Sequence, residues 1–327
     1  MVRILVVGIG SMGWNHARVC SELGVLAGVC DKDEIAVKEV GSKFNVPSFT
    51  DVNNAINSLD LHGLIVATPT FTHIDVVKIG IEHDLHILVE KPIADNYSNG
   101  KQMIELANSS NVSLSVGHIE RFNPVVEKAK ELLESGQLGE IITISSRRVS
   151  NFPGRIRDVG VILDLGIHDI DNSISIMGSK PISVYSSGGS HNDIEHEDHV
   201  SIVIKFENGK SAVLEVNWIT PMKVRTLSLT CEKGFAVLDY IKQSISISAS
   251  KFVDVEDKKQ FPAKIEFDTK NIHIENKEPL RLEVEDFISV INDKKLPKVP
   301  GNEGLLALKV AEAAVESLKT GKVIILD

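Results

Sequence analysis

The chain has 327 residues, of which 43% are hydrophobic and 24% charged, and its formal net charge is −10 at pH 7. That length suits two packed domains, and the excess of acid repels nucleic acid, so we expect no nucleic-acid partner. The first apolar run, residues 4–9, is far shorter than a membrane-spanning helix, so we expect neither a targeting segment nor a membrane partner. Three cysteines without paired spacing favour a reducing, cytoplasmic setting over a disulfide framework or a zinc knuckle.

Short apolar runs alternate with helical patterns over residues 1–120. The expected strands are rich in valine, isoleucine and leucine, as in strands buried on both faces, and cover 3–8, 25–31, 61–69, 85–92 and 112–118. Helical patterns lie near 12–23, 33–44, 73–84 and 97–109. This alternation predicts an α/β domain with a doubly wound parallel sheet.

The pattern changes over residues 121–327, which we expect to form a second α/β domain. A helical pattern at 125–136 precedes expected strands at 140–150, 182–187, 199–218, 224–240, 244–250 and 263–267, of which the third and fourth each contain a turn. Long strands with alternating polar residues predict a large, open, mostly antiparallel sheet. Helical patterns at 280–293 and 303–321 and an edge strand at 322–326 follow.

A glycine pattern follows the first expected strand and opens the first helix. It has the form GxGxxG and comprises Gly8, Gly10, Ser11, Met12 and Gly13. In this setting backbone N–H groups can face a pyrophosphate at a helix N-terminus, with Gly8 permitting the turn, Gly10 a close approach and Gly13 helix–strand packing. The alternative is a tight turn that binds no ligand.

The next expected strand ends at Asp31, 18 residues beyond Gly13. A carboxylate there accepts hydrogen bonds from both ribose hydroxyls and repels a 2′-phosphate, which favours NAD over NADP. Lys32 follows directly and keeps NADP open as a second cofactor.

Two further polar segments stand at the carboxyl ends of expected strands, where ligands bind in open α/β sheets. The first, ATPTFTH at 67–73, provides four candidate contacts on the nicotinamide side: Thr68, Pro69, Thr72 and His73. The second, EKP at 90–92, provides Glu90 and Lys91. The alternatives are a surface lysine at a strand end and a histidine that only occupies the first turn of a helix.

The stretch LDLGIHDID at 163–171 carries three acids and a histidine within an apolar pattern. Asp164 and His168 are four residues apart, so on a helix they share one face, and Asp171 lies near it. Asp158 is the expected cap of that helix. An imidazole beside a carboxylate can act as a base on a substrate hydroxyl. The alternative is a helix with a polar stripe.

Arginines gather in residues 145–157, a segment without acids that precedes this helix: Arg147, Arg148, Arg155 and Arg157. Guanidinium groups bind phosphate with two parallel hydrogen bonds, so we expect Arg155 and Arg157, together with Arg121, to bind a phosphorylated sugar. Surface ion pairs are the alternative, above all for Arg147 and Arg148. His118, at the end of a strand, either contacts substrate or only ends the strand.

A histidine- and acid-rich stretch, HNDIEHEDH at 191–199, raises the alternative of a metal site. Its zinc-type donors are His191, Glu195, His196, Asp198 and His199. Their spacing matches no familiar coordination geometry, so we expect a solvated loop and no metal.

The order of these motifs resembles that of the Gfo/Idh/MocA family, the glucose–fructose oxidoreductase and inositol dehydrogenase type. The matching segments are the glycine pattern, 67–73, 90–92, GHIERFNP at 117–124, 163–171 and the tail EGLLALKVAEAAVESLKTGK. The resemblance implies an N-terminal Rossmann domain and a second domain whose open sheet forms a homodimer or homotetramer. It also implies that the helix at about 302–320 packs back on the first domain and that the Lys91–Pro92 bond is cis.

The family's catalytic lysine falls on Lys91, and its helix Asp and His fall on Asp164 and His168. The resemblance therefore implies hydride transfer from a secondary hydroxyl of a sugar to NAD, without a metal. His168 would accept the hydroxyl proton, Lys91 would stabilise the developing alkoxide, and Asp164 would hold a neighbouring hydroxyl.

Residues 117–126 and 155–171 are similar to the branch that oxidises the 3-hydroxyl of UDP-N-acetylglucosamine, so a nucleotide-linked sugar is the expected substrate. An inositol or other polyol dehydrogenase of the same family is the first alternative. A non-catalytic regulator that senses NAD or a sugar is the second, and the presence of both Lys91 and His168 argues against it.

Overall fold

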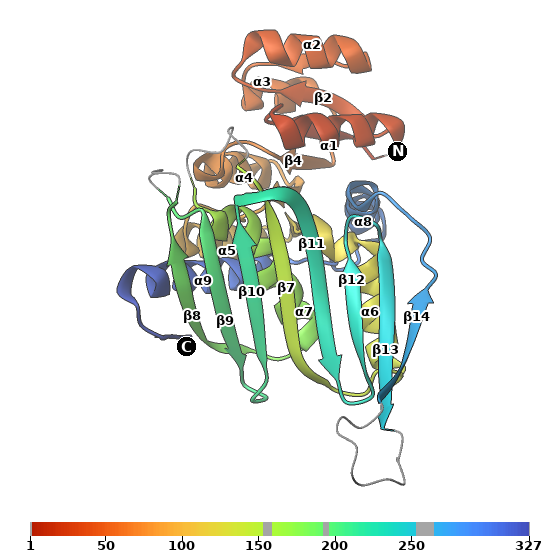
Figure 1. Cartoon of the computed structure of the whole chain (residues 1–327). Coiled ribbons are helices and arrows are strands. Elements are labelled where there is room, and N and C mark those ends of the chain that lie inside the picture. The colour runs from red at the N-terminus through yellow and green to blue at the C-terminus, as the bar shows by residue number, and fades with distance from the viewer. Residues whose placement is uncertain (1, 153–158, 192–195, 253–264, 327) are drawn as a thin grey trace, which may run out of the picture. The chain divides into compact units, whose positions relative to one another are not determined.

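The structure of the protein is a computed structural model that describes residues 2–152, 159–191, 196–252 and 265–326 (Figure 1). The chain divides into two compact units, Met1–Phe122 with Lys277–Lys309, and Asn123–Asn276 with Val310–Asp327. Each unit has its own sheet, which confirms the expected α/β architecture with one parallel and one mostly antiparallel sheet. Of the helices that the structure describes, none has the length and apolarity of a membrane span.

Six parallel strands form the sheet of the first unit, in the order β3-β2-β1-β4-β5-β6. Their bounds are β1 Ile4–Val7, β2 Leu26–Cys30, β3 Ser48–Phe49, β4 Gly63–Val66, β5 His86–Glu90 and β6 Leu114–Gly117. The connecting helices are α1 Ser11–Glu22, α2 Glu34–Phe44, α3 Val52–Ser58, α4 His73–Glu82 and α5 Tyr97–Ser109, with short 3₁₀ turns η1 Thr70–Thr72 and η2 Ile119–Phe122. The order reverses between β1 and β4, and ligands bind at such switch points in sheets of this type.

The sequence pattern does not predict β3 and α3. Their sequences, SF and VNNAINS, are too short and too polar to show a period. The helix α3 begins because the Asp51 carboxylate accepts a hydrogen bond from the Asn54 N–H. The order of the other five strands does not depend on either element.

A helix from far along the chain, α8 Pro279–Asp293, belongs to the first unit. Its apolar residues recur at helical spacing, and Leu280, Val284 and Phe287 are buried in the same core as β1 and β2. Glu283 lies on this buried face as well. The sequence shows that the helix has an apolar face, whereas the sheet that it covers is visible only in the structure.

Nine strands form the sheet of the second unit, in the order β14-β13-β12-β11-β7-β10-β9-β8-β15 (Figure 1). Their bounds are β7 Ile141–Asn151, β8 Pro181–Gly189, β9 His199–Phe206, β10 Ser211–Asn217, β11 Ile219–Cys231, β12 Gly234–Asp239, β13 Ser244–Phe252, β14 Ile265–Ile272 and β15 Ile324–Ile325. Neighbouring strands are antiparallel except β7 and β10. The short strand β15 pairs with β8 at one edge, which confirms the expected edge strand.

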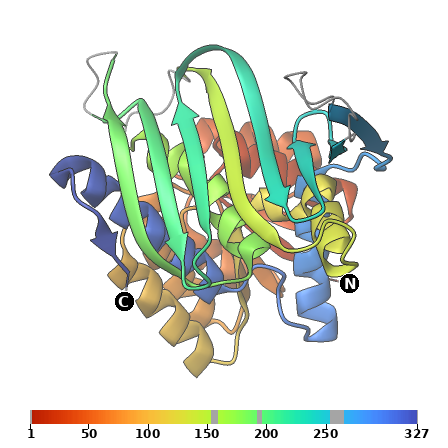
Figure 2. The same cartoon turned by 60° about the horizontal axis from the view of Figure 1, so that its bottom comes forward.

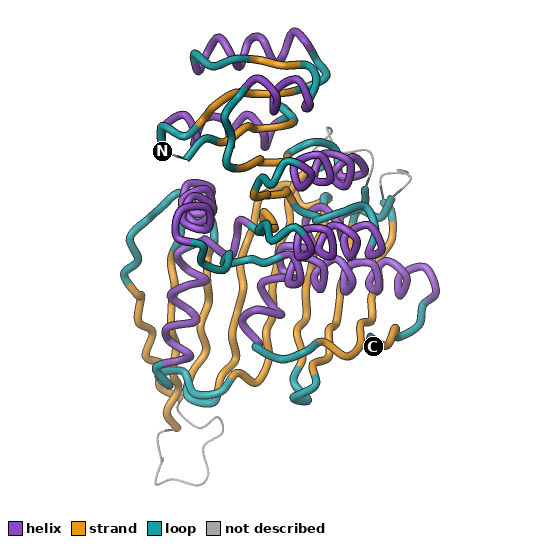
Figure 3. The backbone as a smooth tube through the Cα atoms, turned by 180° about the vertical axis from the view of Figure 1, so that it is seen from behind, coloured by secondary structure: helices purple, strands orange, loops and turns teal. Residues whose placement is uncertain are grey.

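Helices cover one face of this sheet and leave the other open. Helices α6 Pro124–Glu134 and α7 Ile167–Met177 lie behind the strands in Figure 1 and in front of them in Figure 3. Figure 2 shows the opposite face, over which no helix of the described chain runs. The last helix, α9 Gly301–Thr320, is divided between the two units at Lys309.

The strand register places a row of apolar and small side chains across the open face. Tyr185 pairs with Val203, Val203 with Val213, Val213 with Ser145, and Ser145 with Ser228. The two valines and the tyrosine are between 39% and 43% exposed. Contiguous exposed apolar side chains, unlike scattered ones, are typical of an interaction surface.

Phe287→Ala is expected to lower the free energy of unfolding by about 3–5 kcal/mol, because it leaves a cavity where a ring 1% exposed now packs. Chemical denaturation followed by circular dichroism measures the change. The control Leu296→Ala, at a side chain 89% exposed, is expected to stay within about 0.5 kcal/mol of wild type. Equal effects of the two changes would contradict a core role for α8.

Candidate active site

Among the three glycines of the GxGxxG pattern, which spans the end of β1 and the first turn of α1, one leaves room for a ligand. A Cβ at Gly8, whose φ is +86°, would lie 2.6 Å from the Ala67 backbone, and one at Gly13 would lie 1.7 Å from the Gly8 carbonyl oxygen. A Cβ at Gly10 would meet nothing within 4 Å. The packing of the chain itself therefore requires Gly8 and Gly13, whereas Gly10 leaves backbone that a ligand can approach.

The N-terminus of α1 has no side-chain cap and no acidic residue in its first turn. The N-termini of α2, α3 and α5, in contrast, are capped by Asp33, Asp51 and Asn96. Uncapped N–H groups at the positive end of a helix dipole suit an anion. Ser11, which is exposed, and Met12, which is half-buried, belong to this turn. The loop therefore fits the pyrophosphate of a dinucleotide.

Asp31 holds its carboxylate beside the glycine loop. Its Oδ2 accepts a hydrogen bond from the Ile9 N–H at 2.6 Å, and its Oδ1 accepts one from the Asp33 N–H at 2.9 Å. Each oxygen keeps a second lone pair for a ribose hydroxyl. A 2′-phosphate would meet this negative charge, although the exposed Lys32 stands next to it. The residues present thus fit NAD better than NADP.

The turn after β4 is joined to the turn after β5 by a buried histidine. The Thr72 hydroxyl donates to the Pro69 carbonyl at 2.7 Å and lies 2.8 Å from the Thr68 hydroxyl. The His73 ring, 1% exposed, has Nε2 at 3.0 Å from the Thr68 carbonyl and Nδ1 at 3.1 Å from the Pro92 carbonyl. Burial lowers the pKa of His73, so the neutral ring donates to one side at a time. The His73 ring therefore links the turn after β4 to the turn after β5.

Glu90 ends β5 and fixes the backbone of Lys91. Its Oε1 accepts a hydrogen bond from His16 Nε2 at 2.7 Å, and its Oε2 accepts one from the Lys91 N–H at 3.2 Å. Burial opposes ionisation, yet the hydrogen bond from His16, together with the charge and the backbone N–H of Lys91, holds the pKa of Glu90 below its usual value. Lys91 is half-buried, and the Lys91–Pro92 bond is cis, as the resemblance implies. Glu90 is therefore a support for the lysine at the carboxyl edge of the sheet.

Two expected substrate contacts, His118 and Arg121, follow β6 and are buried within the first unit. They are 1% and 5% exposed. The guanidinium of Arg121 forms an ion pair with Glu303, near the start of α9. This ion pair joins two segments of the first unit.

The stretch 163–171 lies on one helix of the second unit, which begins with a π turn, η3 Ile162–Gly166, and continues as α7. Its ionisable residues divide between two environments. Asp164 and His168 are half-buried, whereas Asp169 and Asp171 are 1% and 3% exposed. Because Asp164 and His168 are one turn apart, they share the more accessible side of the helix.

A buried ion pair anchors α7 to β7. The carboxylate oxygens of Asp169 accept hydrogen bonds from Nε and Nη2 of Arg148, each at 3.0 Å, and both side chains are 1% exposed. The Arg148 guanidinium lies 5.3 Å from the centre of the Tyr240 ring, whose hydroxyl accepts a hydrogen bond from Asn172. This bidentate pair fixes the rotation of α7 and hence the direction of the face that carries His168.

The helix begins against Glu197, which the sequence pattern does not single out. The Ile162 N–H donates to the Glu197 carboxylate at 3.1 Å, and the Val161 N–H donates to the Glu197 carbonyl at 3.0 Å. The expected cap, Asp158, lies outside the described residues. Because Glu197 is distant in sequence, no local capping pattern reveals it.

Ion pairs account for two arginines of the basic segment. Arg148 binds Asp169, and Arg147, on the open face of the sheet, lies 3.1 Å from Glu215. Arg155 and Arg157 lie outside the described residues.

Asp198 is the buried carboxylate in the described part of the histidine-rich stretch 191–199. Asp198 is fully buried and accepts hydrogen bonds from the His191 N–H at 3.0 Å and from Nδ1 of His199 at 2.8 Å. His196 is half-buried, and Glu195 lies outside the described residues. Hydrogen bonds within a loop that enters β9 therefore account for this acid.

Two buried ionisable residues of the first unit escape the sequence analysis. His16 follows the glycine pattern by three residues, and Glu283 is the acid on the buried face of α8. The signal that could have found both is the same, an ionisable residue at a position whose helical spacing predicts burial.

The sheet order, the open helix N-terminus and Asp31 together indicate a dinucleotide-binding domain. A family model described as "Oxidoreductase family, NAD-binding Rossmann fold" matches residues 2–118, and one described as "GFO/IDH/MocA C-terminal domain" matches residues 126–237. The chain belongs to this GFO/IDH/MocA family and is an NAD-binding oxidoreductase of the sugar and polyol dehydrogenase class.

Relatives of matching length act on different sugars and polyols. UDP-N-acetylglucosamine 3-dehydrogenase from Acidithiobacillus ferrooxidans is 24% identical over 97% of this chain and 98% of its own. Inositol 2-dehydrogenase from Rhizobium meliloti is 26% identical over 97% of each chain. The solved structure of the former matches with a TM-score of 0.87, at 23% identity over 97% of both chains. WlbA dehydrogenase from Bordetella pertussis, solved with NADH and UDP-GlcNAcA, matches with a TM-score of 0.81, at 20% identity over 100% of this chain and 99% of the other.

Gly10→Ala is expected to weaken NAD binding by ~10-fold or more and to leave the Tm without NAD near that of wild type. The added methyl meets no atom of the chain within 4 Å, so it occupies only space that a ligand would use. Calorimetric titration with NAD and thermal denaturation without it measure the two effects. In the contrasting variant Gly13→Ala, the methyl would lie 1.7 Å from the Gly8 oxygen, so the Tm is expected to fall as well. Wild-type NAD affinity in Gly10→Ala would contradict the cofactor loop.

Proposed function

We propose that the protein oxidises the 3-hydroxyl of UDP-N-acetylglucosamine, with NAD as the hydride acceptor. The observation that carries the proposal is the position of Lys91, which follows β5 at the carboxyl edge of the NAD-binding sheet with its backbone held by Glu90. Relatives named for UDP-N-acetylglucosamine and inositol support a sugar or polyol hydroxyl as the target.

Three side chains act on the sugar in this proposal. The His168 imidazole accepts the proton of the reacting hydroxyl, because imidazole changes protonation near neutral pH. The Lys91 ammonium donates a hydrogen bond to the same oxygen and stabilises the developing alkoxide. Asp164, one turn before His168, accepts a hydrogen bond from a neighbouring hydroxyl and orients the ring. NAD, when bound, would supply the hydride acceptor, so the product would be the 3-keto sugar.

A nucleotide-linked sugar carries a diphosphate, whose charge requires local cations in a chain of net charge −10. Since Arg147 and Arg148 are engaged in ion pairs, we assign this role to Arg155 and Arg157. A structure solved with a UDP sugar matches this chain over its whole length and supports a nucleotide-linked sugar as the substrate. Inositol dehydrogenation is the second candidate function, because an inositol 2-dehydrogenase matches this chain over an equal length.

The same proposal includes a homodimer or homotetramer formed through the open face of the nine-stranded sheet. The row of Tyr185, Val203 and Val213 supports it, because these side chains line up across β8, β9 and β10 and stay exposed in the single chain. A cytoplasmic setting also belongs to the proposal, and three free, buried cysteines are consistent with a reducing compartment.

Lys91→Ala and His168→Ala are each expected to lower kcat/KM for UDP-N-acetylglucosamine by ~10²- to ~10⁴-fold, because each removes a group that acts on the reacting oxygen. NADH formation measures the rate. Lys101→Ala, at a lysine whose side chain is 60% exposed, is the matched control and is expected to behave as wild type. Turnover within a few-fold of wild type in either active-site variant would rule out its assigned role.

The substrate is tested by assaying UDP-N-acetylglucosamine, myo-inositol and glucose side by side with NAD. The proposal expects the highest kcat/KM with the nucleotide sugar. Turnover of myo-inositol without any turnover of UDP-N-acetylglucosamine would replace the proposed substrate by the second candidate.

Val213→Glu is expected to shift the protein from an oligomer to a monomer, because it places a charge in the middle of the apolar row. Light scattering coupled to size-exclusion chromatography measures the mass. Glu105→Lys, at an exposed side chain of the first unit, is the control and should keep the wild-type mass. A wild-type protein that is monomeric at all concentrations would refute the proposed interface.

A further inference from the structure

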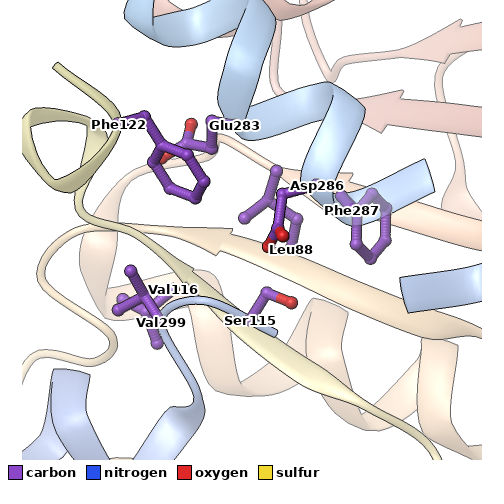
Figure 4. Close-up of a pocket in the computed structure, with 8 residues that line it drawn as sticks. All are labelled: Leu88, Ser115, Val116, Phe122, Glu283, Asp286, Phe287 and Val299. Atoms are coloured by element: carbon purple, nitrogen blue, oxygen red, sulfur yellow. The ribbon is translucent and has the colours of Figure 1, made fainter. Parts of the chain in front are cut away.

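Glu283 is a buried carboxyl on α8 that the proposed reaction does not use. Its side chain is 1% exposed, and neither carboxylate oxygen has a hydrogen-bond partner among the described residues. Figure 4 shows it projecting from α8 beside Phe122, in a pocket whose other lining residues are Leu88, Ser115, Val116, Phe122, Asp286, Phe287 and Val299. An ionised carboxylate is strongly disfavoured there, because no donor replaces the water that it loses.

Glu283 lies next to the two residues that hold Lys91. One nitrogen of His16 and one oxygen each of Glu90 and Glu283 lie within 4.8 Å of one another. His16 Nε2 is bonded to the Glu90 carboxylate, while its Nδ1 is buried and has no hydrogen-bond partner in the part of the chain that the structure describes. Because a carboxylate only accepts hydrogen bonds, His16 donates to Glu90 through Nε2, and in the tautomer with its single proton on Nε2 the Nδ1 atom is an acceptor. A protonated Glu283 is the donor that matches it.

We propose that Glu283 is a positioning residue for Lys91. The Glu283 carboxyl carries a proton and donates a hydrogen bond to His16. It thereby completes a hydrogen-bonded chain through His16 and Glu90 that fixes the backbone of Lys91. The chain runs from α8 to α1 to the end of β5 and finishes at the Lys91 N–H. Because His16 stands on the helix that follows the glycine loop, the chain also couples the cofactor helix to the lysine. The catalytic part of this inference rests on the proposed function, whereas the protonation of Glu283 does not.

The charges around Glu283 agree with a neutral acid. Burial, and then the carboxylates of Glu90 and Asp286, raise the pKa of Glu283 well above its usual value. The elements packed around it carry further titratable and charged groups. They include His16, Arg18 and Glu22 on α1, Glu90 and Lys91 at the end of β5, Glu120 and Arg121 in η2, Arg281, Glu285 and Asp286 on α8, and Lys298 before α9. Arg18, Glu22, Arg281 and Glu285 are engaged in ion pairs at the surface. Arg121 is paired with Glu303, and Lys298 Nζ lies 4.9 Å from the centre of the Phe122 ring. Neither cation donates a hydrogen bond to Glu283.

The protonation of Glu283 is tested by comparing the pH dependence of Tm in the full-length wild type, Glu283→Gln and the control Glu285→Gln. A carboxyl whose pKa is raised on folding keeps its proton in the folded state while the unfolded chain loses it, so wild-type stability falls as pH rises. The Tm of Glu283→Gln minus that of wild type is therefore expected to grow by about 3 °C or more from about pH 6 to about pH 8. Glu285, on the same helix with its side chain 43% exposed, is expected to show no such trend. A difference that stays constant with pH would overturn the neutral Glu283.

The positioning role is tested by turnover of UDP-N-acetylglucosamine. Glu283→Gln keeps an N–H donor and is expected to stay within ~2-fold of wild type, whereas Glu283→Leu should lose ~10-fold or more in kcat with KM within ~3-fold. Wild-type kcat in Glu283→Leu would overturn the role. Equal losses in both variants, or stoichiometric zinc in the purified protein, would show that an ionised ligand is required and would overturn it as well. If the wild type turns over no sugar, the proposed function fails, and the Tm comparison still decides the charge of Glu283.

Discussion

The two hydrogen bonds accepted by Glu90 are the constraint on which the rest of the site depends. They join α1, whose N-terminus is open for an anion, to the backbone of Lys91 at the end of β5. A buried carboxylate is stable only where donors satisfy it, because the loss of either donor leaves a charge in a low-dielectric interior. One buried group therefore sets both the position of the lysine and that of the helix that follows the glycine loop.

The second unit uses the same arrangement. Asp169, which is held by Arg148, is the residue directly after His168. In the first unit, Glu90 is the residue directly before Lys91. Neighbouring residues on a strand or a helix point in different directions, so one can be anchored in the core while the next stays accessible. Lys91 and His168 are thus each adjacent in sequence to a buried, paired carboxylate.

The features that the sequence predicts are those with a local signature. The glycine loop, the buried strands and the four-residue spacing of Asp164 and His168 all follow from periodicity or from the steric needs of glycine. The features that the sequence does not predict depend on which distant segments pack against each other. Tertiary packing sets three of them: the core in which α8 is buried, the contact of Glu197 with the start of the helix formed by η3 and α7, and the pairing of His16 with Glu90. A local stretch of sequence does not show which distant segment it will contact.

The arginines also show that the sequence does not predict which residues contact each other. A cluster of positive charge before the helix indicates phosphate binding, yet the partner of Arg147 is fixed by the register of β7 against β10, and that of Arg148 by the packing of α7. Local composition shows that cations are present, whereas the partner that each one meets is decided by strand pairing. The sequence therefore predicts the kind of chemistry better than the individual residues that perform it.

The central claim is that Lys91 and His168 act on one oxygen of the sugar. The most direct measurement is a crystal structure of the wild type with NADH and UDP-N-acetylglucosamine, a combination that cannot react. The account predicts that Lys91 Nζ and a ring nitrogen of His168 both lie within about 2.6–3.2 Å of the 3-hydroxyl oxygen. A complex in which the two side chains contact different groups of the sugar, or face separate cavities, would contradict it.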